Sequence, residues 1–493
     1  MERYRIGRIE GRWKNFVPPV QGGMFGNAHS TSPEDQSYAD AQVPELVEAS
    51  EGTRGTESSH GSSRAASPLF DNTSPVRNRY NASGVETTSA APEMEEVDGI
   101  TYLDAQTRKQ ISLDLDKYPP LDHDTQANIV EKYRELGERL KAKGLYNCNY
   151  GAYAVEATRY AMLFSASLLL VRWGWYKAGA VFMGLFWHQI AFTAHDAGHM
   201  GITHNFVVDS IIGITIADFL GGLSLGWWKW SHNVHHIVTN LPEHDPDNQH
   251  LPFFAVSHRF FESLWSTYHD RLMHYDGAAQ RFTAVQAWLY YPVMAFGRFN
   301  LYVQSWIYVF GGIGPKKGPA WWHRWLEMAG MAVFWTWFGY LVLYQSIPTA
   351  WDRFAFVMIS HMVTLPLHVQ ITLSHFAMST SDLGPSESFP QKMLRTTMDV
   401  ECPAWLDFVH GGLQFQAIHH LYPRIPRHNL RAAQKMVQEF CNEVGIPYAL
   451  YGFVDGNKKV VGHLAEVSRQ GAILAKCQKT LARRGDLLSD HHH

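Results

Sequence analysis

An apolar run ends in two histidines in the stretch Ala178-Gly-Ala-Val-Phe-Met-Gly-Leu-Phe-Trp-His-Gln-Ile-Ala-Phe-Thr-Ala-His195-Asp-Ala-Gly-His199. The part from Ala178 to Ala194 is predominantly apolar and approaches the roughly 20 residues that a helix needs to cross a membrane. The histidines follow at positions i and i+4, which lie on one face of a helix. The stretch therefore predicts a membrane helix that ends in a metal-binding face.

Two further clusters have histidines at helical spacing: His232-Asn-Val-His235-His236 and Gln416-Ala-Ile-His419-His420. Histidine accounts for 27 of 493 residues, so about one or two HxxxH pairs are expected by chance, whereas HxxHH has an expectation of about 0.1. Neutral imidazoles favour iron, zinc or copper, and a site with little carboxylate or thiolate disfavours magnesium and calcium. One cluster can hold one ion and three can surround two, so the sequence predicts a transition-metal enzyme.

The composition narrows the class of protein further. A formal net charge of -4 and a pI near 6.7 give no basic bias, so we expect no nucleic-acid partner. The four cysteines are scattered without a CxxC pair, which favours a reducing, cytosol-facing environment over a disulfide framework. The mean hydropathy of -0.22 resembles that of a soluble protein only because polar and apolar residues are segregated along the chain.

Four stretches are apolar enough for membrane crossings: Ala154 to Val171, Ala178 to Ala194, Trp325 to Ile347 and Phe354 to Leu373. Two others, Phe206 to Trp228 and Val285 to Phe310, carry polar groups that are costly in lipid. A shared metal site needs an even number of crossings between clusters, so these two are predicted to be interfacial or re-entrant. The excess of Lys and Arg beside the clusters places the site in the cytosol. We expect an all-α integral membrane protein with four transmembrane helices, interfacial helices and a cytosolic, histidine-rich helical cap.

The remaining chain divides by composition. Residues 22–97 are rich in Ser, Thr, Pro, Gly and acidic side chains, which predicts a disordered linker. Residues 98–150 are expected to form a cytosolic helical segment, because Asp122 to Lys143 has apolar residues at helical spacing. The membrane domain is expected over 151–455 and a cytosolic tail over 456–493. The start has no apolar signal-peptide core, so targeting is assigned to the internal helices.

A row of three histidines lies along the fourth predicted crossing and its cytosolic end, at His361, His368 and His375. His375 lies at the cytosolic end and can reach the metals. His361 lies deep in the segment, where a hydrogen bond within the helix bundle is the ordinary explanation. His368 either orients a ligand through its second ring nitrogen or packs. Only His375 is therefore added to the candidate ligands.

The three clusters, in this order and beside these membrane segments, resemble the histidine boxes of the membrane fatty acid and sphingolipid desaturases. The third cluster opens with a glutamine, and in this feature it resembles the third histidine box of the front-end class. The flanking residues Trp228-Lys-Trp-Ser-His232 and His420-Leu-Tyr-Pro-Arg-Ile-Pro-Arg-His-Asn-Leu430 look like those of sphingolipid delta-8 desaturases. The resemblance covers roughly residues 145 to 450. It implies a multi-pass enzyme of the endoplasmic reticulum membrane with two iron ions, O2 as co-substrate, and the metal site and termini in the cytosol.

The resemblance also implies the ligands and the partners. The candidate metal ligands are His195, His199, His232, His235, His236, His375, Gln416, His419 and His420, and all of these histidines except His375 are the candidate catalytic residues. The amide oxygen of Gln416 is a weak ligand, and a hydrogen bond to a bound water is an equal alternative. The implied substrate is a ceramide or sphingoid base, desaturated at the delta-8 position with electrons from cytochrome b5 and its reductase.

Other functions stay open at this point. The clusters do not distinguish a delta-5 or delta-6 front-end fatty acyl desaturase, or a lipid hydroxylase of the same group. A membrane zinc hydrolase of the ceramidase type is the alternative from another class, although it needs only one ion, three histidines and a water.

One feature of front-end desaturases is missing from this sequence, which has no HPGG motif of a fused, haem-binding cytochrome b5 domain. Residues 1–21, with Tyr4-Arg-Ile-Gly-Arg-Ile-Glu-Gly-Arg-Trp-Lys14, resemble the segment that follows such a domain. The sequence therefore either starts after the haem-binding part or belongs to a variant that uses a separate donor. His29, His60 and His123 lie in polar surroundings and form no axial pair. We expect no haem in this chain and a separate cytochrome b5.

Overall fold

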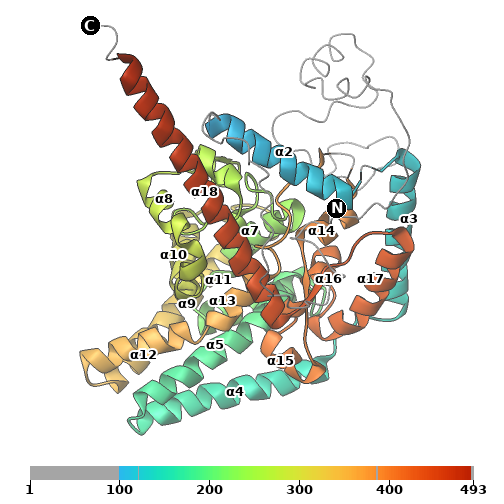
Figure 1. The fold of residues 1–493 in the computed structure, drawn as a ribbon. Helices are drawn as coiled ribbons and strands as arrows, with labels where there is room; N and C mark the ends of the chain where they lie inside the picture. Colours follow the sequence, from blue (N-terminus) through green and yellow to red (C-terminus); the bar gives the residue numbers. More distant parts are fainter. Residues whose placement is uncertain (1–98, 120, 385–386, 490–493) are drawn as a thin grey trace, which may run out of the picture.

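The computed structural model describes residues 99–119, 121–384 and 387–489, and helices make up most of this part (Figure 1). The predictions for residues 1–21 and 22–97, and those for His29 and His60, lie outside the described residues.

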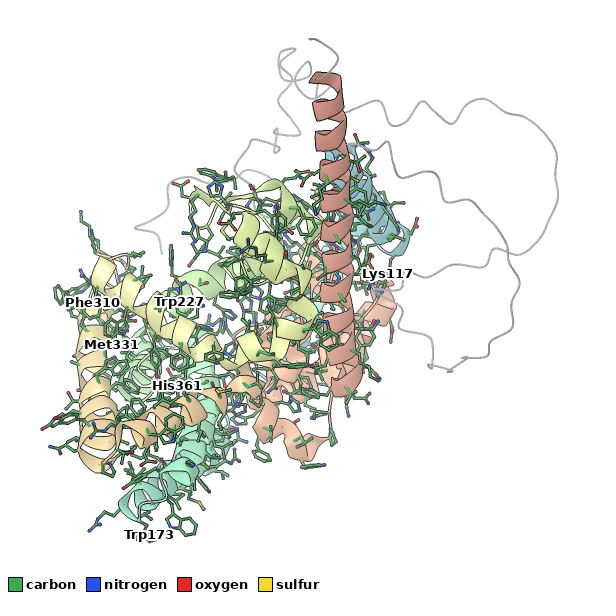
Figure 2. All side chains as sticks on the ribbon, turned by 60° about the vertical axis from the view of Figure 1, so that its left-hand side comes forward. Lys117, Trp173, Trp227, Phe310, Met331 and His361 are labelled. Atoms are coloured by element: carbon green, nitrogen blue, oxygen red, sulfur yellow. The ribbon has the colours of Figure 1, made fainter. Side chains whose placement is uncertain are left out.

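A hairpin of two long helices carries the first cluster. Helix α4, Tyr150–Arg172, is followed by α5, Tyr176–Gly198, which packs along it (Figure 1). Gly174 turns the chain with φ +81°, a left-handed conformation that costs glycine nothing. Trp173 marks the tip of the hairpin (Figure 2), so the other end of α5 delivers His195 to the centre of the molecule.

Three helices of the described part are long and apolar enough to cross a membrane. They are α4, the continuous pair of α11, His323–Phe334, and η5, Trp335–Gln345, and the pair of α12, Ala350–Met362, and α13, Leu365–Leu373. They overlap three of the predicted crossings. The other predicted crossing, Ala178 to Ala194, lies within α5, which is long enough but is not among these three. A fourth span would instead be a bent pair, Phe206–Leu220 and Leu225–Val238, whose helices meet at 116°.

This bent pair consists of α6, Phe206–Ile214, η2, Thr215–Leu220, and α7, Leu225–Val238. It covers the segment from Phe206 to Trp228 that was predicted to be interfacial or re-entrant, and its bend is that of a broken span or of a re-entrant loop. Glu327 of α11 accepts hydrogen bonds from the backbone nitrogen of Gly226 at 2.5 Å and from Ser224 Oγ at 3.0 Å. A carboxylate here satisfies the free N–H groups of the first turn of α7. The second ambiguous segment forms two short helices, α9, Gln286–Ala295, and α10, Gly297–Gly311.

The third cluster lies among helices beyond the membrane candidates. Helix α3, His123–Ala142, confirms the helix predicted from Asp122 to Lys143, and the Asp122 carboxylate caps its start. It packs against α17, Leu430–Val444, beside α2, Gly99–Lys117, and α14, Phe389–Thr396 (Figure 1). The predicted tail 456–493 falls mostly in the long helix α18, Phe453–Ser489, which buries Leu464 and Val467 in a core cluster.

Short elements complete the fold: η3 Pro246–Asn248, η4 His258–Glu262, α8 Gly277–Ala284, η7 Ala404–Leu406, α15 Asp407–His410, η8 Leu413–Phe415, α16 Gln416–Leu421 and η9 Arg427–Asn429. Within the described residues, four short strands depart from the all-α expectation. Strand β1, Trp265–Ser266, pairs antiparallel with β2, Arg271–Leu272, and β3, Asp399–Glu401, pairs parallel with β4, Leu450–Gly452. Strands of two or three residues are too short to leave a periodic signal in the sequence.

Candidate metal centre

Four segments far apart in the chain bring their histidines together. The end of α5 supplies His195 and His199, α7 supplies the second cluster, the residues after α13 supply His375, and α16 supplies the third cluster. Ring centroids lie 4.5 Å apart for His195 and His419, and 4.7 Å apart for His235 and His375. All eight predicted histidines therefore lie in one continuous assembly of rings.

The imidazole nitrogens form two groups, each within 4.8 Å: His195, His199, His232 and His419 in one, and His235, His375 and His420 in the other. His236 lies between the groups, with ring centroids 4.7 Å from His419 and 4.3 Å from His420. Each group offers enough ligands for one transition-metal ion. The arrangement thus suits two neighbouring ions.

The chemistry of these nitrogens fits a metal. His199 Nε2, His419 Nε2 and His420 Nε2 are buried and have no hydrogen-bond partner among the described residues. Buried polar atoms are normally paired, so several orphaned ones at a single place call for a bound group. Burial lowers the pKa of His419 and of His420 well below its ordinary value, and neighbouring imidazoles lower it further. Neutral imidazole is the form that binds metals.

Comparison with known proteins agrees with this geometry. Residues 173–452 match the family model described as fatty acid desaturase. The chain is 57% identical over its whole length to the Delta 8-(E)-sphingolipid desaturase of Emericella nidulans, of which it covers 87%. The chain belongs to the fatty acid desaturase family.

Two other relatives of this desaturase extend the comparison. The Delta 8-(E)-sphingolipid desaturase of Kluyveromyces lactis is 46% identical over 97% of the chain and 83% of the relative. A Helianthus annuus protein named Delta(8)-fatty-acid desaturase is 37% identical over 67% of the chain and 72% of the relative.

Carboxylates that our sequence analysis missed hold the second cluster of the desaturase. His235 Nδ1 lies 2.8 Å from Asp245 Oδ2, and the same carboxylate oxygen accepts a hydrogen bond from the Asn240 backbone nitrogen at 2.6 Å. A carboxylate on Nδ1 fixes the ring tautomer and leaves Nε2 free for a metal. The signal in the sequence was Asp245-Pro-Asp247, close after the second cluster.

A small space adjoins this carboxylate. It measures about 10 Å³ and is lined by His235, Asn240, Asp245, Asp247, Asn248, Ile371, Thr372, His375 and Phe376. This volume suits a single water. Both amide atoms of Asn248 are buried without a partner among the described residues, so Asn248 can hold such a water beside His235 and His375.

Arg427 ties the first cluster to the chain that follows the third. Its guanidinium is buried, forms ion pairs with Asp196 and Glu156, and donates to the Phe192 carbonyl at 3.2 Å and to Thr193 Oγ1 at 3.0 Å. Asp196 lies inside the first cluster, so this contact fixes the last turn of α5 against η9. These partners lie more than 200 residues apart, and no local pattern links them.

Trp228 covers one side of the centre. Its ring stacks on His232 at 4.5 Å and lies 5.2 Å from the rings of His195 and His199. Gly198 makes room for it, because a Cβ there would lie 2.1 Å from Cζ3 of the indole. The Trp228 ring therefore packs directly on the candidate ligands.

The other sequence candidates separate into two kinds. Gln416 opens α16, one turn before His420, and is buried without a side-chain hydrogen bond to any described residue, so its role as a ligand stays a prediction. His361 Nδ1 lies 2.7 Å from the Val357 carbonyl, which confirms the expected bond within the bundle, and His368 Nε2 lies 3.2 Å from Thr364 Oγ1. Neither belongs to the two groups. His123 is exposed beside Asp124.

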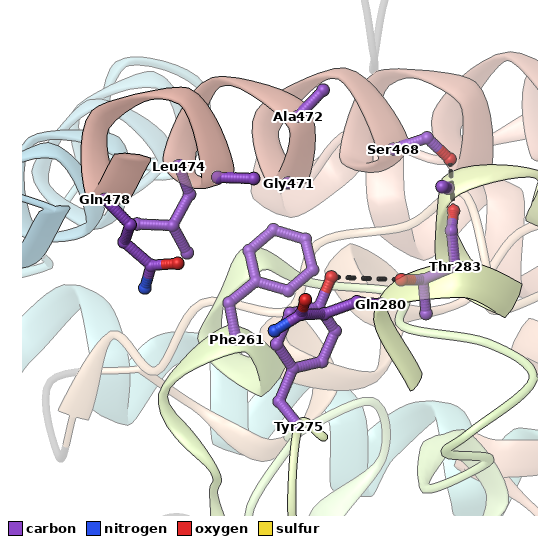
Figure 3. A pocket seen from close by; sticks show the side chains of 11 residues that line it. Phe261, Tyr275, Gln280, Thr283, Ser468, Gly471, Ala472, Leu474 and Gln478 are labelled. Carbon is purple, nitrogen blue, oxygen red and sulfur yellow. Dashed lines mark hydrogen bonds between the residues drawn. The ribbon is translucent and has the colours of Figure 1, made fainter. Parts of the chain in front are cut away.

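A cavity of about 160 Å³ lies elsewhere, between α18 and residues 261–284 (Figure 3). Tyr275 and Thr283 share a hydrogen bond of 3.0 Å in its wall, and Ser468 Oγ donates to the Thr283 carbonyl at 2.7 Å. None of its lining residues is a candidate ligand. The cavity is therefore separate from the metal centre.

Proposed function

We propose that this chain is an iron- and O2-dependent desaturase that introduces a double bond at the delta-8 position of the long-chain base of a sphingolipid. The observation that carries the proposal is a pair of buried histidine groups at the ends of membrane-type helices, in a chain 57% identical over its whole length to a protein of that name. Members of the family generally use two irons and dioxygen.

In this proposal His195, His199, His232 and His419 hold one iron, and His235, His375 and His420 hold the second. His236 lies between the two groups and is the eighth candidate ligand. Gln416 is the ninth candidate, and it either binds an iron or holds a bound water. A bound pair of irons supplies the activation of O2 and the removal of hydrogen from two adjacent methylenes. Methylene groups offer no polar handle, so the protein contributes positioning along an apolar path and the exclusion of water.

The proposed architecture has four transmembrane helices, α4, α5, α11–η5 and α12–α13, together with interfacial helices and a cytosolic, histidine-rich helical cap. It is supported by the meeting of His199 and His375 at one site, because their helices α5 and α13 must then end on the same side of the membrane. The excess of Lys and Arg beside the clusters favours the cytosol, and the family favours the endoplasmic reticulum. Electrons are assigned to cytochrome b5 and its reductase.

The proposed division of the chain follows from this architecture. It comprises the segment 1–21, the linker 22–97, the helical segment 98–150, the membrane domain 151–455 and the cytosolic C-terminal segment 456–493.

The test is expression in a host that lacks delta-8 unsaturated sphingoid bases, followed by mass spectrometry of its lipids. The expected result is a new delta-8 double bond in the long-chain base, with two irons per purified chain. His419→Ala is expected to abolish both, whereas the exposed His123→Ala is the matched control that keeps them. Unsaturation in fatty acyl chains, a hydroxylated lipid, or one zinc per chain would each replace the proposal with one of the alternatives.

A further inference from the structure

An exposed apolar patch is shared by the short segment that leads into the third cluster and by the start of α18. It comprises Trp405 of η7, Phe408 of α15, and Phe453 and Val454 at the start of α18. These side chains are 72%, 44%, 41% and 63% exposed, and the ring of His410 lies 5.8 Å from that of Phe453, which joins the two parts. We call these four residues the Trp405 patch. No hydropathy window marks it, because the chain reaches it by two short elements.

We propose that the Trp405 patch is inserted into the lipid bilayer. Residues 404–410 then form a re-entrant segment, which enters the membrane without crossing it. The inference rests on the proposed membrane topology and extends it to a part of the chain that hydropathy assigns to the cytosol.

The depth of the segment follows from its contacts with α5. Gln189 Nε2 donates to the Phe408 carbonyl at 2.8 Å, and His188 Nε2 lies 2.9 Å from the Val409 carbonyl. Lys177 and Arg172 at the hairpin turn belong outside the hydrocarbon. At a rise of 1.5 Å per residue, Gln189 lies at most about 18 Å from Lys177 along α5. The hydrocarbon core is about 30 Å thick, so Phe408 and Val409 lie within it.

The same contacts provide hydrogen-bond partners for two backbone carbonyls at that depth, those of Phe408 and Val409. Irregular backbone is tolerated inside a membrane only where protein groups pair its N–H and C=O. Gln189 and His188 provide this pairing, and Gln370 Oε1 of α13 holds His410 Nδ1 at 2.7 Å. The polar residues that make α5 less apolar than an ordinary span thus have partners in the re-entrant segment.

Charged residues at the edge of the patch are paired and partly or largely exposed: Arg431 and Asp407 are 34% and 37% exposed, and Lys458 pairs with Asp455, which follows Val454. Asp407 Oδ2 accepts a hydrogen bond from Arg431 Nε at 2.8 Å. The Arg159 guanidinium donates to Gln189 Oε1 at 3.0 Å and lies 4.8 Å from the ring of Phe408. The outward side chains of the patch carry no charge. Lipid is favoured as the occupant because Phe408 lies against Arg159 of α4, a helix apolar enough to cross a membrane whose surface exposes Val155 and Met162 at 63% and 68%.

The test labels single cysteines in the full chain, in liposomes, with a fluorophore that reports polarity. Cys148 and Cys477 are first replaced by serine, whereas the native Cys402 and Cys441 are buried and are kept, with the protein that has no introduced cysteine as the labelling blank. Trp405→Cys is compared with Met162→Cys, on the membrane candidate α4, and with Lys435→Cys, on an exposed position of α17. Quenching is measured with doxyl-labelled phosphatidylcholine and with aqueous iodide. Only preparations with the iron content and elution volume of the unlabelled protein are used.

The expected result is that the label at residue 405 loses as much fluorescence to the lipid quencher as the label at 162, and little to iodide. Quenching by iodide equal to that at residue 435 would overturn the proposal. Protection from both quenchers would also overturn it, because a protein partner or a second copy would then cover the patch. The readout does not use catalysis, so the proposed reaction can fail without affecting the result.

Discussion

Gly198→Ala is predicted to empty the metal centre without unfolding the chain. The added Cβ would lie 2.1 Å from Cζ3 of Trp228 and 3.0 Å from two further ring atoms. Carbon atoms in contact sit about 3.5 Å apart, so the indole has to retreat by about 1.4 Å. Trp228 stacks on His232 and borders His195 and His199. Metal–ligand distances tolerate only about 0.2 Å, so this shift removes ligands from the first group.

The stability cost is modest by comparison. Overpacking typically costs about 1–3 kcal/mol, and replacing glycine by alanine in a helix returns at most about 1 kcal/mol. The net loss of at most about 3 kcal/mol is smaller than the stability of about 5–15 kcal/mol that is typical of a folded protein, so the variant stays folded. We therefore expect normal expression and elution, but an iron content well below that of the wild type.

The assay is iron per purified chain by elemental analysis, together with the delta-8 product in the expression host. Gly462→Ala is the matched control, because a Cβ at this position of α18 meets nothing within 4 Å. A double variant, Gly198→Ala with Trp228→Leu, removes the clashing ring and should recover part of the iron. Wild-type iron and product in Gly198→Ala would refute the steric argument.

Three further predictions concern the surroundings of the centre. Arg427→Met leaves the buried carboxylate of Asp196 without its guanidinium partner, which costs about 3–5 kcal/mol; a melting temperature equal to that of the wild type would contradict it. Burial raises the pKa of Asp399 to about 7, above its unfolded value of about 4. The protonated side chain therefore contributes to the free energy of unfolding in full below pH 4, and this contribution is lost as the pH rises through 7. Thermal unfolding between pH 5 and 8 should show this decline, and Asp399→Asn should flatten it; identical pH profiles would argue against the assignment. Chelation of iron should lower the melting temperature, because bound metal stabilises only the folded state, and re-addition of ferrous iron should restore it.

The clustering of the candidate ligands was largely predictable because these histidines repeat at helical spacing. His232, His235 and His236 share one face of α7 for that reason, and their richness in imidazole signals a transition metal. The partners that position these rings were not predictable. Asp245 is an unremarkable loop residue until the fold places it on His235, and Asp196 gains its importance from Arg427, which lies more than 200 residues away.

The membrane helices show a similar limit. Apolar length predicted four crossings, and three of them coincide with helices long and apolar enough to cross a membrane. The fourth, in α5, combines an apolar run with His188 and Gln189, whose partners lie on α15. A hydropathy average counts such side chains as costs and cannot register a partner that arrives later in the chain. The strands β3 and β4 have the same character, because three residues such as Asp399–Glu401 carry no period of their own.

The two histidine groups are built from segments far apart in the chain, so the ribosome makes their residues at different times. His195 precedes His420 by more than 200 residues, so at about 5–20 residues per second the ribosome exposes the first cluster at least about ten seconds before the third exists. During this interval the nascent chain presents an incomplete chelate. Neither group can close around an ion until α16 has been made. In the proposed enzyme, completion of both iron sites is therefore a late step in biogenesis, after translation has passed residue 420.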